Sequence, residues 1–235
     1  MNTMPAHTRT IFDADLHEVV QMVAEMGGLA ERQIAQAINA LVRQNHALAQ
    51  AVIDRDADLD ALQAKIEAKA VSMIAQRQPL AVDLREIISA LHISNDLERI
   101  GDLAKNIGKR TIAIGNDTLP ISLVGGIEHM TRLVMEQFKK VLDSYVARDI
   151  GTALSVRNED LQVDNLNNAL FYETFIYMGE DPQRIATCAQ ILFCVKNLER
   201  IGDHATNIAE AIHYIISGHL PARERPKANN ANLIH

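Results

Sequence analysis

The sequence predicts an all-α protein made of two tandem antiparallel three-helix bundles related by internal duplication. Three observations lead to this prediction. Apolar residues recur with a period of about 3.6 along almost the whole chain, interrupted by Gly, Pro and Asp/Asn clusters. Only 4% of the residues are aromatic and Trp is absent, a composition that suits helices better than β-sandwiches. The third observation is an internal repeat, which is described below.

The apolar periodicity predicts six helices, at residues 13–46, 48–76, 80–114, 122–148, 151–178 and 183–217. Pro79 and Pro182 stand where they can open a helix, because the first helical turn does not use the missing N–H. Gly115 and Gly218 are placed to end the third and sixth helices. Residues 221–235 combine charge, Pro and Asn without periodicity, so we expect a disordered tail there.

A repeated segment indicates that the chain contains two copies of one unit. Residues 96–102 of the third helix read DLERIGD, and residues 197–203 of the sixth read NLERIGD. Upstream, residues 56–62 of the second helix (DADLDAL) correspond to residues 160–166 of the fifth (DLQVDNL). A fixed repeat of this length is typical of a duplicated helical unit.

The duplication predicts two domains followed by the tail. We place the first three-helix unit at residues 1–116 and the second at residues 117–220.

The charge balance and the cysteines restrict the classes of function. Acidic residues outnumber basic ones, 30 against 23. This balance argues against nucleic acid as a partner, because phosphate backbones bind surfaces on which positive charge is clustered. No segment is apolar and long enough to cross a bilayer, so we expect a cytoplasmic protein that meets membranes only through partners. Cys188 and Cys194 share one predicted helix but point apart, so they cannot pair and fit a reducing compartment as buried apolar residues.

The candidate metal ligands are carboxylates placed four residues apart on two neighbouring helices of each unit. On a helical wheel, Glu98 and Asp102 continue an apolar stripe of the third helix, whose opposite side is also apolar and should therefore be contacted too. Asp56 and Asp60 lie at the margin of the core stripe of the second helix. The fifth and sixth helices repeat this arrangement. The candidate set is Asp56, Asp60, Glu98, Asp102, Asp160, Asp164, Glu199 and Asp203, flanked by Asn106 and Asn207.

Two interpretations of these acids remain open. Like charges at this spacing cost a helix roughly 0.2 to 0.5 kcal/mol per pair, so the repeated pairs are unfavourable unless something neutralises them. A bound cation would do so, and carboxylate oxygens suit Mg²⁺, Mn²⁺ or iron better than a structural zinc. Alternatively, Arg99 and Arg200, each three residues before an acid, form salt bridges on a solvated face. No Gly-rich phosphate loop, HExxH motif or nucleophile elbow is present, so we predict no catalytic residue.

A known family carries the same motifs. Gln78-Pro79 is followed by Asp83-Leu84-Arg85, then by LERIGD at residues 97–102 and LERIGDH at residues 198–204. With these segments in a two-unit chain, the sequence resembles the PhoU family, from about Phe12 to Gly218. The resemblance implies a pair of three-helix bundles with E(D)xxxD motifs that hold multinuclear metal clusters in some members. By position, those motifs are the eight carboxylates named above.

The resemblance also implies a function. The family acts as a cytoplasmic negative regulator of the phosphate-starvation response, between the phosphate ABC transporter and a membrane sensor histidine kinase. We therefore expect a non-catalytic adaptor that contacts the transporter ATPase and the sensor kinase, and that forms a homodimer. The alternatives from other classes are a metal-dependent phosphohydrolase and a metal-storage bundle. One departure is visible: Glu67 of the second helix is matched by Phe171 in the fifth, so the two metal sites are expected to differ.

Overall fold

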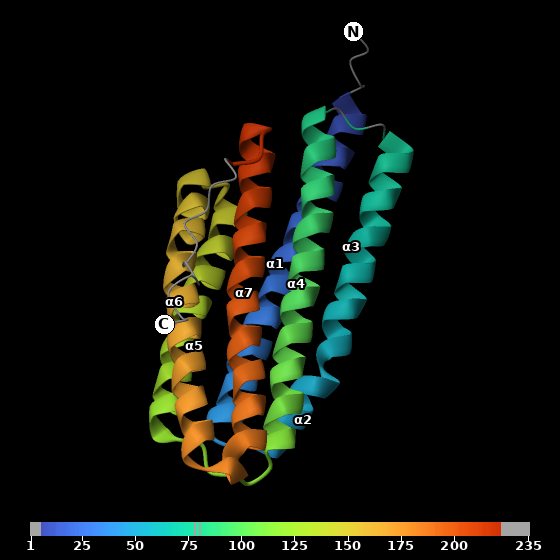
Figure 1. The fold of residues 1–235 in the computed structure, drawn as a ribbon. Helices are drawn as coiled ribbons and strands as arrows, with labels where there is room; N and C mark the ends of the chain where they lie inside the picture. Colours follow the sequence, from blue (N-terminus) through green and yellow to red (C-terminus); the bar gives the residue numbers. More distant parts are fainter. Residues whose placement is uncertain (1–5, 78, 80, 222–235) are drawn as a thin grey trace.

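The structure, a computed structural model, describes residues 6–77, 79 and 81–221, and the side chains of residues 6–11 and 77 are not described. The predicted all-α fold is confirmed, since the described residues form helices and no strand (Figure 1). All but Pro221 of the expected tail lies outside the described residues. The elements are α1 (Ala6–Val42), α2 (His46–Asp54), α3 (Asp56–Arg77), α4 (Ala81–Ile114), α5 (Ile121–Ala147), α6 (Ile150–Glu180), the 3₁₀ helix η1 (Pro182–Arg184) and α7 (Ile185–Ser217).

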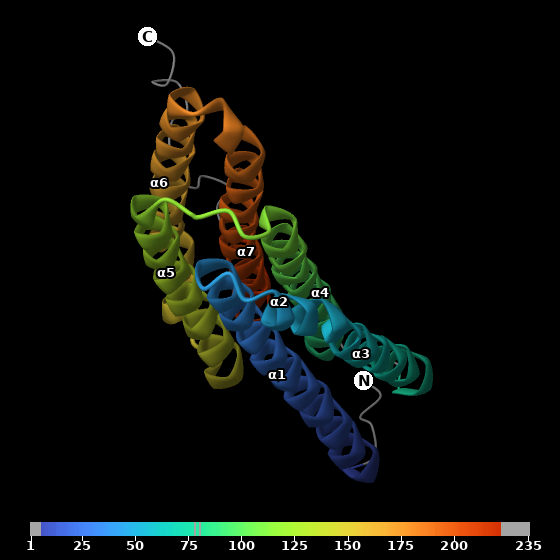
Figure 2. The same cartoon turned by 90° about the horizontal axis from the view of Figure 1, so that it is seen from below.

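The prediction of one unbroken second helix over 48–76 is wrong, because the chain bends at Arg55 between α2 and α3 (Figure 2). The N–H of Arg55 donates to the carbonyl of Ala51 at 3.3 Å, and the N–H of Asp58 donates to the Arg55 carbonyl at 3.1 Å. Asp56 and Asp58 then stand in the first turn of α3, where the positive end of the helix dipole favours negative charge. The first of the candidate acids is therefore at a helix start.

The turn after the first helix of each unit is repeated in detail. Asn45 caps α2 by accepting a hydrogen bond from the Leu48 N–H, and Asp149 caps α6 by accepting from Gly151 and Thr152. The residue before each cap, Gln44 (φ 51°) or Arg148 (φ 54°), adopts a left-handed conformation. The same capping chemistry at equivalent places supports the duplication.

The α4 and α7 helices lie side by side at the centre of the molecule and run in opposite directions (Figures 1 and 2). The α1, α2 and α3 helices pack on α4, and α5 and α6 pack on α7. One apolar core runs through both units. It includes the inner face of α4, as the helical wheel predicted, through Ile93, Leu97, Ile100, Ala104 and Ile107, which are fully buried.

The remaining features of the fold agree with the sequence. Gly115 (φ 67°) and Gly218 (φ 79°) follow the ends of α4 and α7 in the left-handed conformation that glycine adopts freely. Cys188 and Cys194 are buried and unpaired. Of the helices described, none has the length and apolar character needed to span a bilayer.

Candidate metal centre

The first acidic cluster lies between the start of α3 and the middle of α4. Asp56, of which only 8% is exposed, forms a salt bridge with Lys105 of α4. The same ammonium group lies 2.9 Å from Oδ1 of Asp102. These two carboxylates raise the pKa of Lys105, the hydrogen bond to Asp56 contributing most. Lys105 therefore holds a fixed positive charge between two of the candidate ligands.

Glu98 and Asp60 complete this cluster without a direct salt bridge to Lys105. Burial raises the pKa of the Glu98 carboxyl, and the negative charges of Asp102 and Asp60 raise it further against the opposing effect of Arg99. Arg99 lies 3.5 Å from both Glu98 and Asp102, which is the ion pairing predicted for a solvated face. Asp60 itself is exposed. Three of the four predicted acids of this unit, Asp56, Glu98 and Asp102, thus already contact a cation of the chain.

The second acidic cluster lies between α6 and α7 and is more deeply set. Asp160 is 8% exposed and stands in the interior of α6. Glu199 Oε1 lies 2.6 Å from the ammonium of Lys196, whereas Glu199 Oε2 is buried and has no hydrogen-bond partner among the described residues. Burial raises the pKa of Glu199, and Asp203 and Asp164 add to this effect while Lys196 opposes it. Three of the predicted acids of the second unit, Glu199, Asp203 and Asp164, are therefore close enough to influence one another.

Two buried glutamines next to the clusters were missed by the sequence reasoning. Gln33 of α1 and Gln137 of α5 are 5% and 2% exposed, and in each the Oε1 atom has no partner within the described part of the chain. Gln33 donates through Nε2 to the Val52 carbonyl at 3.3 Å. The repeat could have revealed them, because Gln137 precedes Asp160 by the same interval as Gln33 precedes Asp56.

The glycine of each LERIGD segment has no side chain, which allows side chains of the neighbouring helices, including Gln33 and Gln137, to come close to α4 and α7. A Cβ atom placed on Gly202 would lie 3.2 Å from Asp160 Oδ1 and 3.5 Å from Gln137 Oε1. On Gly101, a Cβ atom would lie 3.1 Å from Gln33 Oε1 and only 2.3 Å from Cδ1 of Leu59. Polar oxygens therefore converge on Gly202, whereas an apolar side chain covers Gly101.

The predicted flanking residues behave differently from the acids. Asn207 donates to Asp96 Oδ1 of α4 at 3.3 Å, and His204 Nδ1 lies 2.8 Å from the same oxygen, so both link α7 to α4. Asn106 is half-buried and Arg200 is exposed. Glu67, the residue whose mismatch with Phe171 suggested unequal sites, is also exposed. The mismatch between Glu67 and Phe171 therefore concerns two exposed residues.

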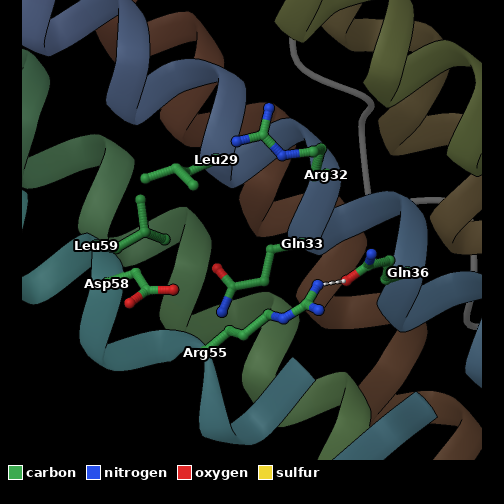
Figure 3. A pocket seen from close by; sticks show the side chains of 7 residues that line it. All are labelled: Leu29, Arg32, Gln33, Gln36, Arg55, Asp58 and Leu59. Atoms are coloured by element: carbon green, nitrogen blue, oxygen red, sulfur yellow. Dashed lines mark hydrogen bonds between the residues drawn. The ribbon is translucent and has the colours of Figure 1, made fainter. Parts of the chain in front are cut away.

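A surface pocket of about 190 Å³ adjoins the bend between α2 and α3 (Figure 3). Arg55 reaches across it and donates to Oε1 of Gln36 at 3.2 Å. Gln33 lies between Leu59 and Arg55 in this view (Figure 3), and its Oε1 atom is 3.1 Å from where a Cβ on Gly101 would be. The pocket lining combines Leu29, Arg32, Gln33, Gln36, Arg55, Asp58 and Leu59.

The donor chemistry of the second cluster fits a hard cation. Its carboxylate and amide oxygens are ligands that Mg²⁺, Mn²⁺ and iron accept, and Glu199 Oε2 and Gln137 Oε1 are buried without a partner among the described residues. Across the part of the chain that the structure describes, no three His, Cys, Asp or Glu side chains are arranged to hold a metal together. Metal binding by the eight acids therefore stays a prediction, and it requires the carboxylates of neighbouring helices to turn toward one another.

Comparisons with known proteins identify relatives along nearly the whole chain. The PhoU domain family matches twice, at residues 23–111 and 127–212. The phosphate-specific transport system accessory protein PhoU homolog of Rhizobium meliloti is 48% identical over 222 residues, covering 94% of each chain. The homolog of Caulobacter vibrioides is 47% identical over 224 residues, covering 95% of this chain and 97% of its own.

Solved structures of two such proteins share the fold. The crystal structure of PhoU from Pseudomonas aeruginosa superposes with a TM-score of 0.85 at 36% identity, covering 88% of this chain and 100% of that one. The phosphate transport system regulatory protein PhoU from Streptococcus pneumoniae superposes with a TM-score of 0.83 at 28% identity, covering 90% and 99%.

Proposed function

The chain belongs to the PhoU family, and we propose that it is an accessory protein of a phosphate-specific transport system that represses the phosphate-starvation response. The observation that carries this proposal is the full-length match to relatives named as accessory proteins of that system. The proposed role is that of a cytoplasmic adaptor, forming a homodimer, between the transporter ATPase and a sensor histidine kinase.

The surface of α6 supports a role in binding other proteins. Phe171, Tyr172, Phe175 and Ile176 are 47% to 62% exposed on one stretch of this helix. The rings of Phe171 and Phe175 contact each other, with centroids 4.9 Å apart. Exposed aromatic side chains of this kind are enriched where proteins bind one another.

A metal ion is part of the proposal. Iron, manganese and magnesium suit the carboxylate oxygens of the acidic clusters, and zinc suits them less. Bound only to the folded chain, such an ion would stabilise it and fix the spacing of the helices that carry the acids.

The test is complementation in cells from which the gene has been removed. Such cells should express phosphate-starvation genes when phosphate is plentiful, and the parent chain should restore repression and associate with the transporter ATPase or the sensor kinase. Phe171→Ser/Phe175→Ser should weaken association and repression together, whereas Val71→Ser, at a more exposed apolar residue of α3, should leave both unchanged. The hydrolase interpretation would replace the adaptor interpretation if the metal-loaded protein hydrolyses phosphoesters at an appreciable rate. A single carboxylate substitution would then have to abolish both hydrolysis and repression.

A further inference from the structure

We propose that the pocket beside the bend between α2 and α3 binds a phosphate group that still carries a proton, namely orthophosphate. The pocket has a volume of about 190 Å³, which is the share of roughly six water molecules in the liquid. A five-atom oxyanion therefore fits in it together with some of its bound water. The inference goes beyond the proposed adaptor role and depends neither on that role nor on metal binding.

Two arginines supply the hydrogen-bond donors for an oxyanion. Arg32 of α1 and Arg55, between α2 and α3, both line the pocket, and Figure 3 shows them on opposite sides of the Gln33 side chain. Both arginines are exposed, and neither forms an ion pair with a carboxylate of the described residues. Arg55 donates to Oε1 of Gln36 at 3.2 Å, so most of the five N–H donors of its guanidinium group remain available.

A carboxylate in the pocket selects among oxyanions. Asp58 lines the same pocket, and its carboxylate is exposed and has no partner among the side chains that the structure describes. This carboxylate repels an anion without a hydrogen, whereas an anion with an O–H group can donate to it. At pH 7 orthophosphate keeps at least one proton and sulfate keeps none. A phosphomonoester, with a second pKa of about 6, has then lost most of its second proton.

The second unit fills the equivalent place with an ion pair of its own. Counted at the interval that separates the two buried glutamines, Lys140 of α5 corresponds to Gln36. Glu159 of α6 corresponds to Arg55 in the same way. The ammonium group of Lys140 lies 2.9 and 2.8 Å from the two carboxylate oxygens of Glu159, so these charges neutralise each other. In the first unit, the same scaffold instead carries a guanidinium group that contacts only a neutral amide.

The charge of the pocket differs from that of the chain. The protein has a formal net charge of −7, so an anion is attracted only where cations are gathered. Arg32 and Arg55 against Asp58 give the pocket a local excess of one positive charge. In the second unit an acid, Glu136, stands at the place of Arg32. A small anion is therefore favoured at the pocket of the first unit and not at its counterpart.

Equilibrium dialysis with radiolabelled orthophosphate tests the inference. The untagged full-length protein is first stripped with a chelator, because a bound metal ion would itself bind phosphate. It is then dialysed at pH 7 in a buffer free of sulfate. We expect one saturable site per chain. Sulfate and glycerol phosphate should each displace the label at least about tenfold less effectively than unlabelled orthophosphate does.

Charge variants locate the site. Arg32→Gln and Arg55→Gln should each lower the affinity for orthophosphate about tenfold or more, because each removes hydrogen bonds from a charged donor. Gln36→Lys/Arg55→Glu, which copies the ion pair of the second unit, should abolish binding. Asp58→Asn should remove the preference over sulfate, because an amide can donate to either anion. Arg132→Gln, at an exposed arginine of α5, is the control and should bind as the parent does.

The absence of saturable binding by the parent would overturn the inference. So would unchanged binding in Arg32→Gln and Arg55→Gln, whose exposed side chains can be replaced without disturbing the core, or an equal loss in Arg132→Gln. Sulfate that competes as well as orthophosphate in the parent would overturn the selection by Asp58. Tighter binding of glycerol phosphate would overturn orthophosphate as the ligand. The adaptor role is judged separately, by complementation.

Discussion

Glu98 and Glu199 occupy equivalent positions on α4 and α7. In the metal-free protein, the surroundings of each carboxyl group disfavour its charged form. Burial is the largest cause of the raised pKa in both, and the acids of the neighbouring helix add to it. A group whose pKa is higher in the folded than in the unfolded chain stabilises the fold while it is protonated. That contribution is lost as the pH rises through the folded pKa.

Neutral substitution should therefore stabilise the metal-free protein at neutral pH. In the presence of a chelator, Glu98→Gln should raise the melting temperature at pH 7 by roughly 1–2 °C, because it removes repulsion from Asp102 and Asp60. At pH 4, below the ordinary glutamate pKa of 4.5, the parent carboxyl is itself largely protonated and the difference should vanish. Thermal unfolding at both pH values measures this.

Glu67→Gln, at an exposed site on α3, is the control and should change the melting temperature little at either pH. A lower melting temperature of Glu98→Gln at pH 7 would mean that the ion pair with Arg99 outweighs burial and repulsion.

The sequence placed the eight acids correctly on facing helices but could not predict their partners. Helical spacing shows which side chains share a face of one helix, so Arg99 beside Asp102 was predictable. The contact between Lys105 and Asp56 joins different helices and depends on how these pack. Gln33 and Gln137 were missed because a polar residue within an apolar stripe looks like any surface position until its burial is known.

Each acid-bearing helix approaches its neighbour at a glycine. At Gly101 the α3 helix is so close that Cδ1 of Leu59 lies 2.3 Å from where a Cβ would be, whereas at Gly202 the nearest atom of α6 is an oxygen of Asp160 at 3.2 Å. Leu59 is itself 2% exposed and has little room to move. The two positions therefore differ in how much a methyl group would disturb them.

Alanine substitutions should separate the two positions. Gly101→Ala should destabilise the protein by about 1–3 kcal/mol because it overpacks a buried contact, and Gly202→Ala should cost less because the neighbouring atoms need to move by only tenths of an ångström. Gly125→Ala, in α5 with nothing within 4 Å, should stabilise by about 0.5–1 kcal/mol through helix propensity. Urea unfolding gives all three values. If the two alanine substitutions at Gly101 and Gly202 lower the free energy of unfolding equally, then α3 moves aside for the added methyl group as easily as α6 does.

Helix existence was predictable, whereas the ends of the first helix, Ala6 and Val42 instead of residues 13 and 46, and the break within the second were not. Long segments with a period of about 3.6 residues, ended by Gly or introduced by Pro, gave helices where they were expected. The bend at Arg55 escaped prediction because the apolar pattern continues from Val52 to Leu59 across it. Arg55 itself is an ordinary helix-forming residue, and the local sign of the break is the pair of acids, Asp56 and Asp58, in the first turn of α3.

The units meet through α4 and α7, and this pairing makes the two halves one folded body. Arg110 of α4 donates to Gln190 at 3.1 Å and lies over the ring of Phe193 at 4.4 Å, while Asp96 contacts His204 further along. The sequence predicted that α4 is contacted on two sides but not by which helix, since both of its faces are apolar. With one core running through both units, neither half can unfold without exposing apolar surface of the other.

The whole molecule should therefore unfold in a single cooperative step. Cys188 and Cys194 are at most 1% exposed in α7, and burial raises the pKa of the Cys194 thiol to about 12, so both should resist thiol reagents until the second unit opens. A variant with Val23→Cys, Cys188→Ala and Cys194→Ala places the only thiol in the core of the first unit, because Val23 is fully buried in α1. In urea titrations, thiol labelling and far-ultraviolet circular dichroism should share one midpoint within each protein, since two-state unfolding requires every probe to report the same transition. If thiol labelling and the helical signal of the Val23→Cys variant have different midpoints, or the native thiols become reactive before the helices melt, the units unfold independently and the α4–α7 contact does not couple them.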